Sequence, residues 1–253
     1  MRKKESKEIT SVHVMNQDAP FAIRESFNML RTNLLYTITE EQNGCPIYGI
    51  ASTNENTGKS TVITNLAISF THLGKKVLLI DGDMRCPTIH LYFDIDKHHV
   101  GLSEMISGIE SDVMVKDAVP GLDVITSGRI PPNPSELITS PRFLELLNHW
   151  RQEYDIIFID FPPISIVTDA IAVCKNITGY IFAIRSGRSN AKAVKSAIES
   201  MERLGAKIVG VVLNDYNLKD VKGHRYANSR YSTYSKYQKN MAAASSKKGK
   251  SEK

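Results

Sequence analysis

A Gly-Lys-Ser-Thr tetrapeptide, residues 58–61, stands between a short apolar run and an amphipathic stretch, and this arrangement constrains the fold more than any other feature of the sequence. The apolar run, residues 47–51, predicts a buried strand, and the stretch that follows, residues 61–73, predicts a helix. Successive backbone N–H groups and the positive end of a helix together form a cradle for anions. The order of strand, loop and helix therefore predicts a phosphate-binding loop over Ser52–Thr61.

The loop has the residue types that phosphate and magnesium binding require. Gly58 lets the backbone approach a phosphate closely, Lys59 can reach the β- and γ-phosphates, and the Ser60 hydroxyl can ligate Mg²⁺. Thr53 replaces the usual first glycine, and the same tetrapeptide also occurs at ordinary helix starts, so the flanking strand and helix carry the prediction. The residues expected to contact the nucleotide share this loop: Asn56, Thr57, Gly58, Lys59, Ser60 and Thr61.

Two later apolar runs end in carboxylates. Residues 77–80 are followed by the Asp-Gly-Asp-Met-Arg sequence of residues 81–85, and residues 156–159 are followed by Asp160. In open α/β sheets, ligands bind at the carboxyl ends of the strands, where an acidic residue can hold Mg²⁺ directly or through water. Taken alone, the Asp-Gly-Asp sequence is more typical of a solvated turn, and Asp160 is unspecific because many buried strands end in Asp. Because these aspartates follow a phosphate-binding loop in the chain, they predict one site shared with that loop.

The rest of the chain alternates apolar runs with amphipathic stretches. Because the runs are apolar throughout, they predict strands covered on both faces, and hence a doubly wound, mostly parallel α/β sheet of the P-loop NTPase type, MinD/ParA-like, with helices on both faces. Arg185 and Asn214 end two of these strands and are expected to contact the nucleotide, Asn214 near its base. Further strands are predicted over residues 122–126, 180–184 and 208–213, and helices over 101–106, 140–150 and 191–204. Residues 171–175 are expected to close another helix, and residues Ser127–Pro134 to form a rigid loop.

The composition predicts one α/β domain with tails in a chain of 253 residues. No apolar run approaches the roughly 18 residues needed to cross a bilayer, and no hydrophobic segment follows the charged N-terminus, so we expect a cytoplasmic protein. The three cysteines are widely spaced and lack a Cys-x-x-Cys pair, which argues against disulfides and zinc.

Three segments are expected. Residues 1–20 are polar and predict a flexible N-terminal segment, residues 21–217 hold the domain, and residues 218–253 predict a disordered tail. From residue 219 onward the tail carries a charge of +8, against −3 for the rest, within a net charge of +5. The pattern over residues 21–37 predicts an amphipathic helix, and the sequence favours equally a helix that packs on its own domain and one that docks on another subunit.

These motifs resemble those of the bacterial tyrosine kinases of capsule and exopolysaccharide synthesis, in the form whose kinase is a separate chain. The likeness runs from about Glu25 to Asn214; Val77–Arg85 matches the family's second Walker motif, Ile156–Asp160 its Walker B motif, and Thr126–Leu137 a loop typical of the family. The resemblance implies an ATP- and Mg²⁺-dependent protein-tyrosine kinase whose subunits phosphorylate each other's tail tyrosines. Those tyrosines are Tyr226, Tyr231, Tyr234 and Tyr237.

The resemblance also implies residue roles and partners. Lys59 would bind phosphates, Asp81 would accept the tyrosine proton, and Ser60, Asp83 and Asp160 would form the metal shell. The expected partners are a second copy of the chain, a transmembrane activator of the chain-length-determinant (Wzz-like) type, and a cognate tyrosine phosphatase. The activator would recruit the kinase to the inner face of the cell membrane.

Four residues at three sites depart from the family pattern. Glu55-Asn56 replaces Pro-Gly in the phosphate loop, and a carboxylate near a triphosphate is unfavourable unless it points to solvent. Asn28 interrupts the Glu-x-x-Arg-x-x-Arg pattern otherwise kept at Glu25 and Arg31, so ring-like assembly does not carry over. Phe161 replaces the usual threonine after Asp160.

Two alternative functions compete with the kinase. A switch ATPase that positions septa or plasmids shares the fold and motifs, but such proteins usually carry a lysine where this chain has Asn54. A nucleic-acid binder would use the basic, tyrosine-containing tail, yet charge runs are usually only solvated and stacking platforms normally lie on folded sheets. The sequence therefore favours the kinase, with no nucleic-acid partner.

Overall fold

The computed structural model describes residues 14–15, 19–38, 44–166 and 169–216. Residues 1–214 belong to one compact unit, and the chain from Asp215 onward forms a second unit of which only residues 215–216 are described. Among the described helices, none is long and apolar enough to cross a membrane.

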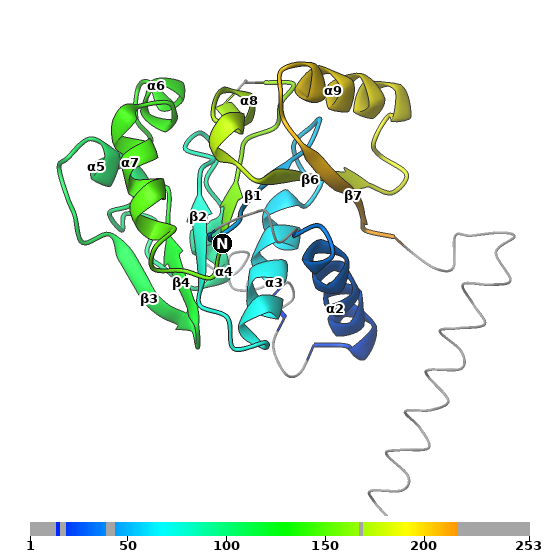
Figure 1. Ribbon diagram of the computed structural model, residues 1–253, viewed down its shortest axis with the longest axis horizontal. Helices are drawn as coiled ribbons and strands as arrows, with labels where there is room; N and C mark the ends of the chain where they lie inside the picture. Colours follow the sequence, from blue (N-terminus) through cyan, green and yellow to red (C-terminus); the bar gives the residue numbers. More distant parts are fainter. Residues whose placement is uncertain (1–13, 16–18, 39–43, 167–168, 217–253) are drawn as a thin grey trace, which may run out of the picture. The chain divides into compact units, whose positions relative to one another are not determined.

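One sheet organises the described domain, and its strands run in the order β3-β4-β2-β5-β1-β6-β7 (Figure 1). All strand pairs are parallel except β3 with β4, so the predicted doubly wound, mostly parallel sheet is confirmed. The strands are β1 (Ile47–Ala51), β2 (Val77–Asp81), β3 (Met114–Val119), β4 (Leu122–Ile125), β5 (Ile156–Asp160), β6 (Gly179–Arg185) and β7 (Ile208–Asn214).

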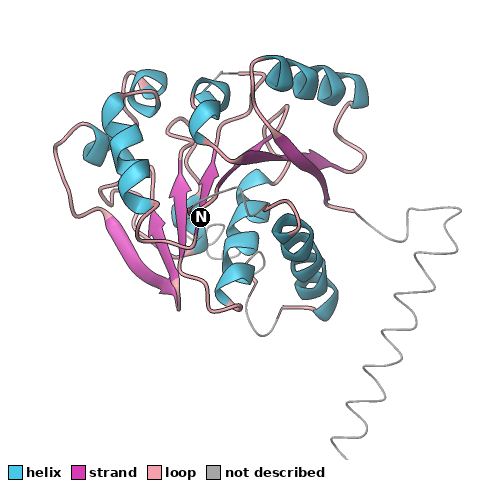
Figure 2. Cartoon of the chain, in the orientation of Figure 1, coloured by secondary structure: helices cyan, strands magenta, loops and turns pink. Residues whose placement is uncertain are grey.

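Helices cover both faces of the sheet (Figure 2). One face packs against α2 (Phe21–Leu35), α3 (Lys59–Thr71) and α4 (Ile89–Tyr92). The other face packs against α5 (Leu102–Ile106), α6 (Pro134–Ile138), α7 (Pro141–Trp150), α8 (Asp169–Ala172), a 3₁₀ turn (Cys174–Asn176) and α9 (Ala191–Arg203).

The alternation of side chains along each strand builds two separate hydrophobic layers. On β1, Tyr48 and Ile50 pack towards α3, whereas Ile47 and Ala51 pack towards the opposite layer. Every residue of β1, β2 and β5 is buried. Complete burial of a large apolar side chain contributes about 1.5–3 kcal/mol, which is why these central strands are apolar throughout.

Three local predictions are wrong. The chain forms an antiparallel edge strand, β3, where no strand was predicted. The sequence gives no signal for it, because the exposed Lys116 and Asp117 interrupt the apolar residues. The predicted rigid loop ends one residue early, because Pro134 begins the short helix α6, and proline is well suited to a first helical position. The helix expected to close over residues 171–175 ends earlier, because α8 stops at Ala172 and a 3₁₀ turn over Cys174–Asn176 follows it.

The helix α2 packs on its own domain. Leu34 is buried, and Phe27 and Leu30 pack against the layer formed by α3. The Arg31 guanidinium donates a hydrogen bond to the Ser69 carbonyl at the end of α3. The intramolecular packing interpretation of this helix is therefore confirmed.

Gly101 is a sharp test of the packing between the loop after β4 and the start of α5. A Cβ atom at Gly101 would lie 2.3 Å from the backbone nitrogen of Gly128 and 2.3 Å from the carbonyl oxygen of Thr126. Backbone atoms on both sides cannot move aside cheaply, so Gly101→Ala is expected to lower the free energy of unfolding by roughly 1–3 kcal/mol. Gly210→Ala is the matched control, because a Cβ there meets nothing within 4 Å. Urea denaturation measures both, and equal stability of the two variants would contradict this account.

Candidate active site

The predicted order of strand, loop and helix is present, because β1 ends at Ala51 and α3 begins at Lys59. Gly58 lies in the left-handed region with φ of 86° and precedes α3, which begins at Lys59. Thr57 and Lys59 are buried, with 4% and 7% of their surface exposed. Glu55 is exposed, so its carboxylate is screened by solvent, as a nearby triphosphate would require.

Three carboxylates gather beside this loop. Asp81 and Asp160 are register partners on the adjacent strands β2 and β5, and the exposed fractions of Asp81, Asp160 and Asp83 are 0%, 1% and 7%. Burial and the charges of Asp160 and Asp83 raise the pKa of Asp81 well above its usual value. Burial also raises the pKa of Asp160 to about 6, although the Lys59 charge and the Ser60 hydrogen bond oppose this. The cluster has more negative than positive charge, which a bound cation would relieve.

Ser60 and Thr88 connect the phosphate loop to these carboxylates. The Ser60 hydroxyl donates a hydrogen bond to Asp160, and the Thr88 hydroxyl donates to Ser60 Oγ at 2.8 Å. The backbone N–H groups of Thr88 and Ile89 donate to Asp81 Oδ2 at 3.1 and 3.0 Å. Sequence reasoning missed Thr88, because it lies beyond a Cys-Pro turn and has no motif of its own.

The arrangement fits a magnesium ion that is shared with phosphates. Asp160 Oδ1 is buried and has no hydrogen-bond partner, so it is available to a cation. Within the described ranges, no three His, Cys, Asp or Glu side chains could hold a metal by themselves. Mg²⁺ usually takes only one or two carboxylates and completes its shell with substrate phosphates and water. Ser60, Asp160 and Asp83 are therefore a suitable donor set only together with a nucleotide.

Arg185 and Asn214 hold the loop from the ends of β6 and β7. Arg185 Nη1 donates to the Asn56 carbonyl at 2.9 Å, and Asn214 Nδ2 donates to the Thr57 carbonyl at 3.0 Å. The Asn214 amide also lies against Gly58, where a Cβ would come within 2.0 Å of it. In this conformation both side chains therefore support the loop backbone.

Polar contacts between side chains also hold the segment after β2 in place. Arg85 Nη2 donates to Ser135 Oγ at 2.9 Å, and Arg85 Nε lies 3.8 Å from Asp169 Oδ2. Ser135 in turn donates to Asp169 Oδ1 at 2.6 Å. Asp169 is buried, with 3% of its surface exposed. These contacts join residues far apart in sequence, so no local pattern predicts them.

Two further side chains complete the surroundings of the site. The Tyr92 hydroxyl lies 2.8 Å from Thr61 Oγ1, and burial raises the pKa of Tyr92 to about 12. Phe161, the departure after Asp160, is fully buried, and its ring lies 5.9 Å from that of Tyr180. A Cβ at Gly49 would touch both rings, so Phe161 fills core space beside β1.

The structure brings together every described residue predicted for the site. Lys59, Ser60, Asp81, Asp83 and Asp160 form the centre. Thr61 lies on α3 beside them, while Arg185 and Asn214 hold the loop from its other side. The four tail tyrosines predicted as phosphoryl acceptors lie outside the described residues.

Comparisons with known proteins agree with this geometry. Residues 48–232 match the family model of the CobQ/CobB/MinD/ParA nucleotide binding domain. The tyrosine-protein kinase CpsD of Streptococcus agalactiae is 36% identical over 195 residues, which span 76% of this chain and 82% of CpsD.

Two solved structures place the fold. The kinase domain of the Escherichia coli tyrosine kinase ETK matches with a TM-score of 0.74 and 31% identity, over 84% of this chain and 86% of that one. The septum site-determining protein MinD of Pyrococcus horikoshii, solved with Mg-ADP, matches with a TM-score of 0.58 and 24% identity, over 71% and 74% of the chains, and shows the fold alone. Identity to CpsD over most of both sequences and the match over residues 48–232 show that this chain belongs to the bacterial tyrosine-protein kinases, within the CobQ/CobB/MinD/ParA family of nucleotide-binding domains.

Proposed function

We propose that this chain transfers the γ-phosphoryl group of ATP to tail tyrosines of a neighbouring copy, in a Mg²⁺-dependent reaction. The observation that supports this most is the direct hydrogen bond from Ser60 of the phosphate loop to Asp160, whose register partner is Asp81. Three sequence motifs separated by about 20 to 100 residues thereby meet at one point of the sheet edge. The proposed acceptors are Tyr226, Tyr231, Tyr234 and Tyr237.

Phosphoryl transfer depends on positioning and on neutralising the charge that spreads over the phosphoryl oxygens. We assign Lys59 and the loop amides from Asn56 to Thr61 to phosphate binding, and Ser60, Asp83 and Asp160 to the metal shell. The bound Mg²⁺ would neutralise part of the phosphate charge. Arg185 and Asn214 keep the loop in its binding shape through the two carbonyl contacts described above.

Asp81 is the proposed acceptor of the tyrosine proton. As the tyrosine oxygen forms its bond to the γ-phosphorus, the bond to the β–γ bridging oxygen breaks, ADP leaves, and the phenolic proton passes to the carboxylate. A tyrosine pKa of about 10 makes such a base useful at neutral pH. Asp81 has no exposed surface and accepts hydrogen bonds from Thr88 and Ile89, so the segment before α4 must move for tyrosine to reach it.

The family likeness supports a wider context for this activity. We propose that the kinase regulates capsular or extracellular polysaccharide synthesis, and that a transmembrane activator of the chain-length-determinant type recruits it to the inner face of the cell membrane. A tyrosine phosphatase would reverse the modification. Phosphorylation between copies requires at least transient self-association.

One experiment separates the kinase from the switch ATPase that shares its fold. Purified full-length protein is incubated with Mg²⁺ and [γ-³²P]ATP, with an activating partner where one is needed. A kinase leaves the label on the protein, in the tail tyrosines mapped by mass spectrometry. If the label appears only as free phosphate, the switch ATPase is the correct function.

Asp160→Asn tests the metal site. Asparagine keeps the shape of the side chain but removes one of the charges that attract Mg²⁺. The affinity for ATP in the presence of Mg²⁺ is therefore expected to fall by about tenfold or more. Thermal unfolding with and without Mg-ATP measures this, because ligand binding to the folded state raises Tm. Asp155→Asn is the control, since Asp155 is exposed and pairs with Lys75 at 3.4 Å. A full Mg-ATP shift in Asp160→Asn would contradict the assignment.

A further inference from the structure

One departure from the family pattern, Glu55, carries a charge that has no partner among the described residues. Its side chain is exposed, and no hydrogen bond or ion pair joins it to another part of the described domain. The neighbouring Asn56 has a φ of 57°, in the left-handed region that glycine adopts readily and asparagine tolerates best among the other residues. Asn56 therefore keeps the backbone turn that a glycine would give, whereas Glu55 adds a negative charge that neither backbone geometry nor packing explains.

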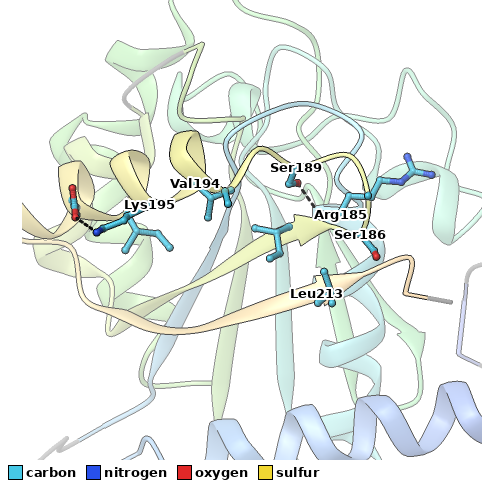
Figure 3. Close-up of a pocket in the computed structure, with 11 residues that line it drawn as sticks. Arg185, Ser186, Ser189, Val194, Lys195 and Leu213 are labelled. Atoms are coloured by element: carbon cyan, nitrogen blue, oxygen red, sulfur yellow. Dashed lines mark hydrogen bonds and ion pairs between the residues drawn. The ribbon is translucent and has the colours of Figure 1, made fainter. Parts of the chain in front are cut away.

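Contacts on both sides hold the loop around Glu55 in place. On one side, the Ser165 N–H donates to the Thr53 carbonyl at 3.4 Å. On the other side, the Arg185 guanidinium extends away from α9 (Figure 3) and donates to the Asn56 carbonyl at 2.9 Å. Because the backbone is held before and after Glu55, its carboxylate has a limited range at the rim of the phosphate loop.

This rim lies close to the place where we propose phosphoryl transfer. Glu55 precedes Gly58 by three residues, and consecutive Cα atoms are about 3.8 Å apart, so the two Cα atoms lie within roughly 11 Å of each other. Thr57 and Lys59 are buried inside the loop, whereas Glu55 is exposed to the solvent from which an acceptor must enter. A long cationic side chain next to an acceptor tyrosine can therefore reach the carboxylate.

The sequence around the proposed acceptors supplies such cations. Of the ten tyrosines in the chain, the six before residue 217 all follow a residue without positive charge. Tyr234 in the tail follows Thr233. The other three tail tyrosines each directly follow a cation, in the pairs Arg225-Tyr226, Arg230-Tyr231 and Lys236-Tyr237. A cation immediately before the tyrosine thus distinguishes most of the proposed acceptors from every other tyrosine of the chain.

Resting on the proposed kinase function, we propose that Glu55 is a specificity-determining residue that pairs with the cation directly before an acceptor tyrosine in the tail of a neighbouring copy. The tail carries +8 from residue 219 onward and the rest of the chain −3, so long-range attraction favours the same encounter. Arginine can bind a carboxylate through two parallel hydrogen bonds, so Arg225 and Arg230 suit Glu55 better than Lys236 does.

The expected effect of this pair on the rate is moderate. Both charges are exposed to solvent and screened by salt, and the loss of an exposed ion pair changes an equilibrium by up to about fivefold. Glu55→Lys should have a larger effect than Glu55→Gln, because it replaces attraction of the tail by repulsion. Neither variant should weaken ATP binding, since each removes a negative charge from the neighbourhood of the triphosphate.

Transfer between two different full-length chains tests the proposal. The donor has its four tail tyrosines replaced by phenylalanine and the acceptor carries Lys59→Met, so only transfer from donor to acceptor is measured. Mass spectrometry gives the initial rate at each tyrosine with Mg-ATP, under the conditions in which the wild-type chain labels itself. Glu55→Gln in the donor is expected to slow the three tyrosines that follow a cation by about three- to fivefold, and to leave Tyr234 close to its normal rate.

An exchange of charges identifies the contact itself. Arg230→Glu in the acceptor should slow labelling of Tyr231 by about tenfold and leave the other tail tyrosines unchanged. Glu55→Lys in the donor should then restore labelling of Tyr231 by about threefold or more, because the two charges again have opposite sign. A structural role of Glu55 would slow all four tyrosines alike, and no change in the acceptor would correct it.

Glu202→Lys in the donor is the matched control. It makes the same charge change at an exposed position near the end of α9, which leads into the start of β7. The phosphate loop is held from the opposite end of β7, by Asn214, so Glu202→Lys should leave all four rates unchanged. Thermal unfolding shows whether each donor variant is folded.

The possible results separate this proposal from the kinase function. If the donor with Glu55 intact labels no tyrosine, the proposed function fails and this inference fails with it. If that donor labels the tail, and Glu55→Gln slows all four tyrosines equally or none of them, only the role of Glu55 is wrong. Failure of Glu55→Lys to restore Tyr231 in the Arg230→Glu acceptor, or a higher KM for ATP in Glu55→Gln, would also overturn it.

Discussion

Lys59→Met is expected to reduce tyrosine phosphorylation by at least about 10²–10³-fold, because it removes the buried cation that would face the β- and γ-phosphates. Methionine has a similar length, so the space beside Gly58 stays filled. The measurement is incorporation of label from [γ-³²P]ATP into the full-length chain, with the modified residues mapped by mass spectrometry. Tyrosine labelling at the wild-type rate would rule out the proposed site.

Lys75→Met provides the matched control for this variant. The Lys75 side chain is 48% exposed and pairs with Asp155 at 3.4 Å, and it precedes β2, at the opposite end of that strand from Asp81. Exposed pairs of this kind contribute about 0–1 kcal/mol, so stability and labelling should both remain close to wild type. A large loss in Lys75→Met would show that labelling responds to general damage instead of to the phosphate contact.

Replacing Tyr226, Tyr231, Tyr234 and Tyr237 together by phenylalanine is expected to remove nearly all phosphotyrosine from the protein. Phenylalanine lacks the hydroxyl that receives the phosphoryl group, while the phosphate loop and its carboxylates are unchanged. Phosphopeptide mapping after incubation with Mg-ATP measures the loss, and equilibrium ATP binding shows that the nucleotide site is intact.

Other tyrosines provide an internal control for this variant. Tyr36 and Tyr216 are 85% and 43% exposed, so accessibility alone would allow both to be modified. Tyr48 and Tyr180 are fully buried and cannot reach another molecule without unfolding. Continued strong labelling of the fourfold variant at Tyr36 or Tyr216 would contradict the assignment of the tail as the main acceptor.

The sequence is sufficient to predict the central strands, because burial of both faces of a strand requires apolar residues within that strand itself. Strands covered on both faces must be apolar along their whole length, and β1, β2 and β5 show this in unbroken runs that end at a loop or an aspartate. The sequence did not predict the edge strand β3, because none of its residues is fully buried and the exposed Lys116 and Asp117 interrupt any apolar run. The short helix α6 was hidden by a proline cluster that also suits a loop.

The centre of the site was predictable for a different reason. Phosphate and magnesium chemistry restricts the residue types at strand ends, so Lys59, Ser60, Asp81 and Asp160 were visible as motifs. Thr88 and the contact of Arg85 with Asp169 were not, since their partners are chosen by tertiary packing across loops. The sequence predicts Asn214 near the nucleobase. Its hydrogen bond to the Thr57 carbonyl joins residues far apart in the sequence, so no local pattern indicates it.

Thr88 has a consequence for the enzyme at rest. Its hydroxyl is bonded to the serine that would ligate the metal, and its amide is bonded to the carboxylate that would take the tyrosine proton. One residue thus contacts both groups, and a displacement of Thr88 would break its bond to Ser60 and its bond to Asp81 together. In this resting arrangement the Asp81 carboxylate has no exposed surface, so any acceptor hydroxyl reaches it only after Thr88 and Ile89 have moved.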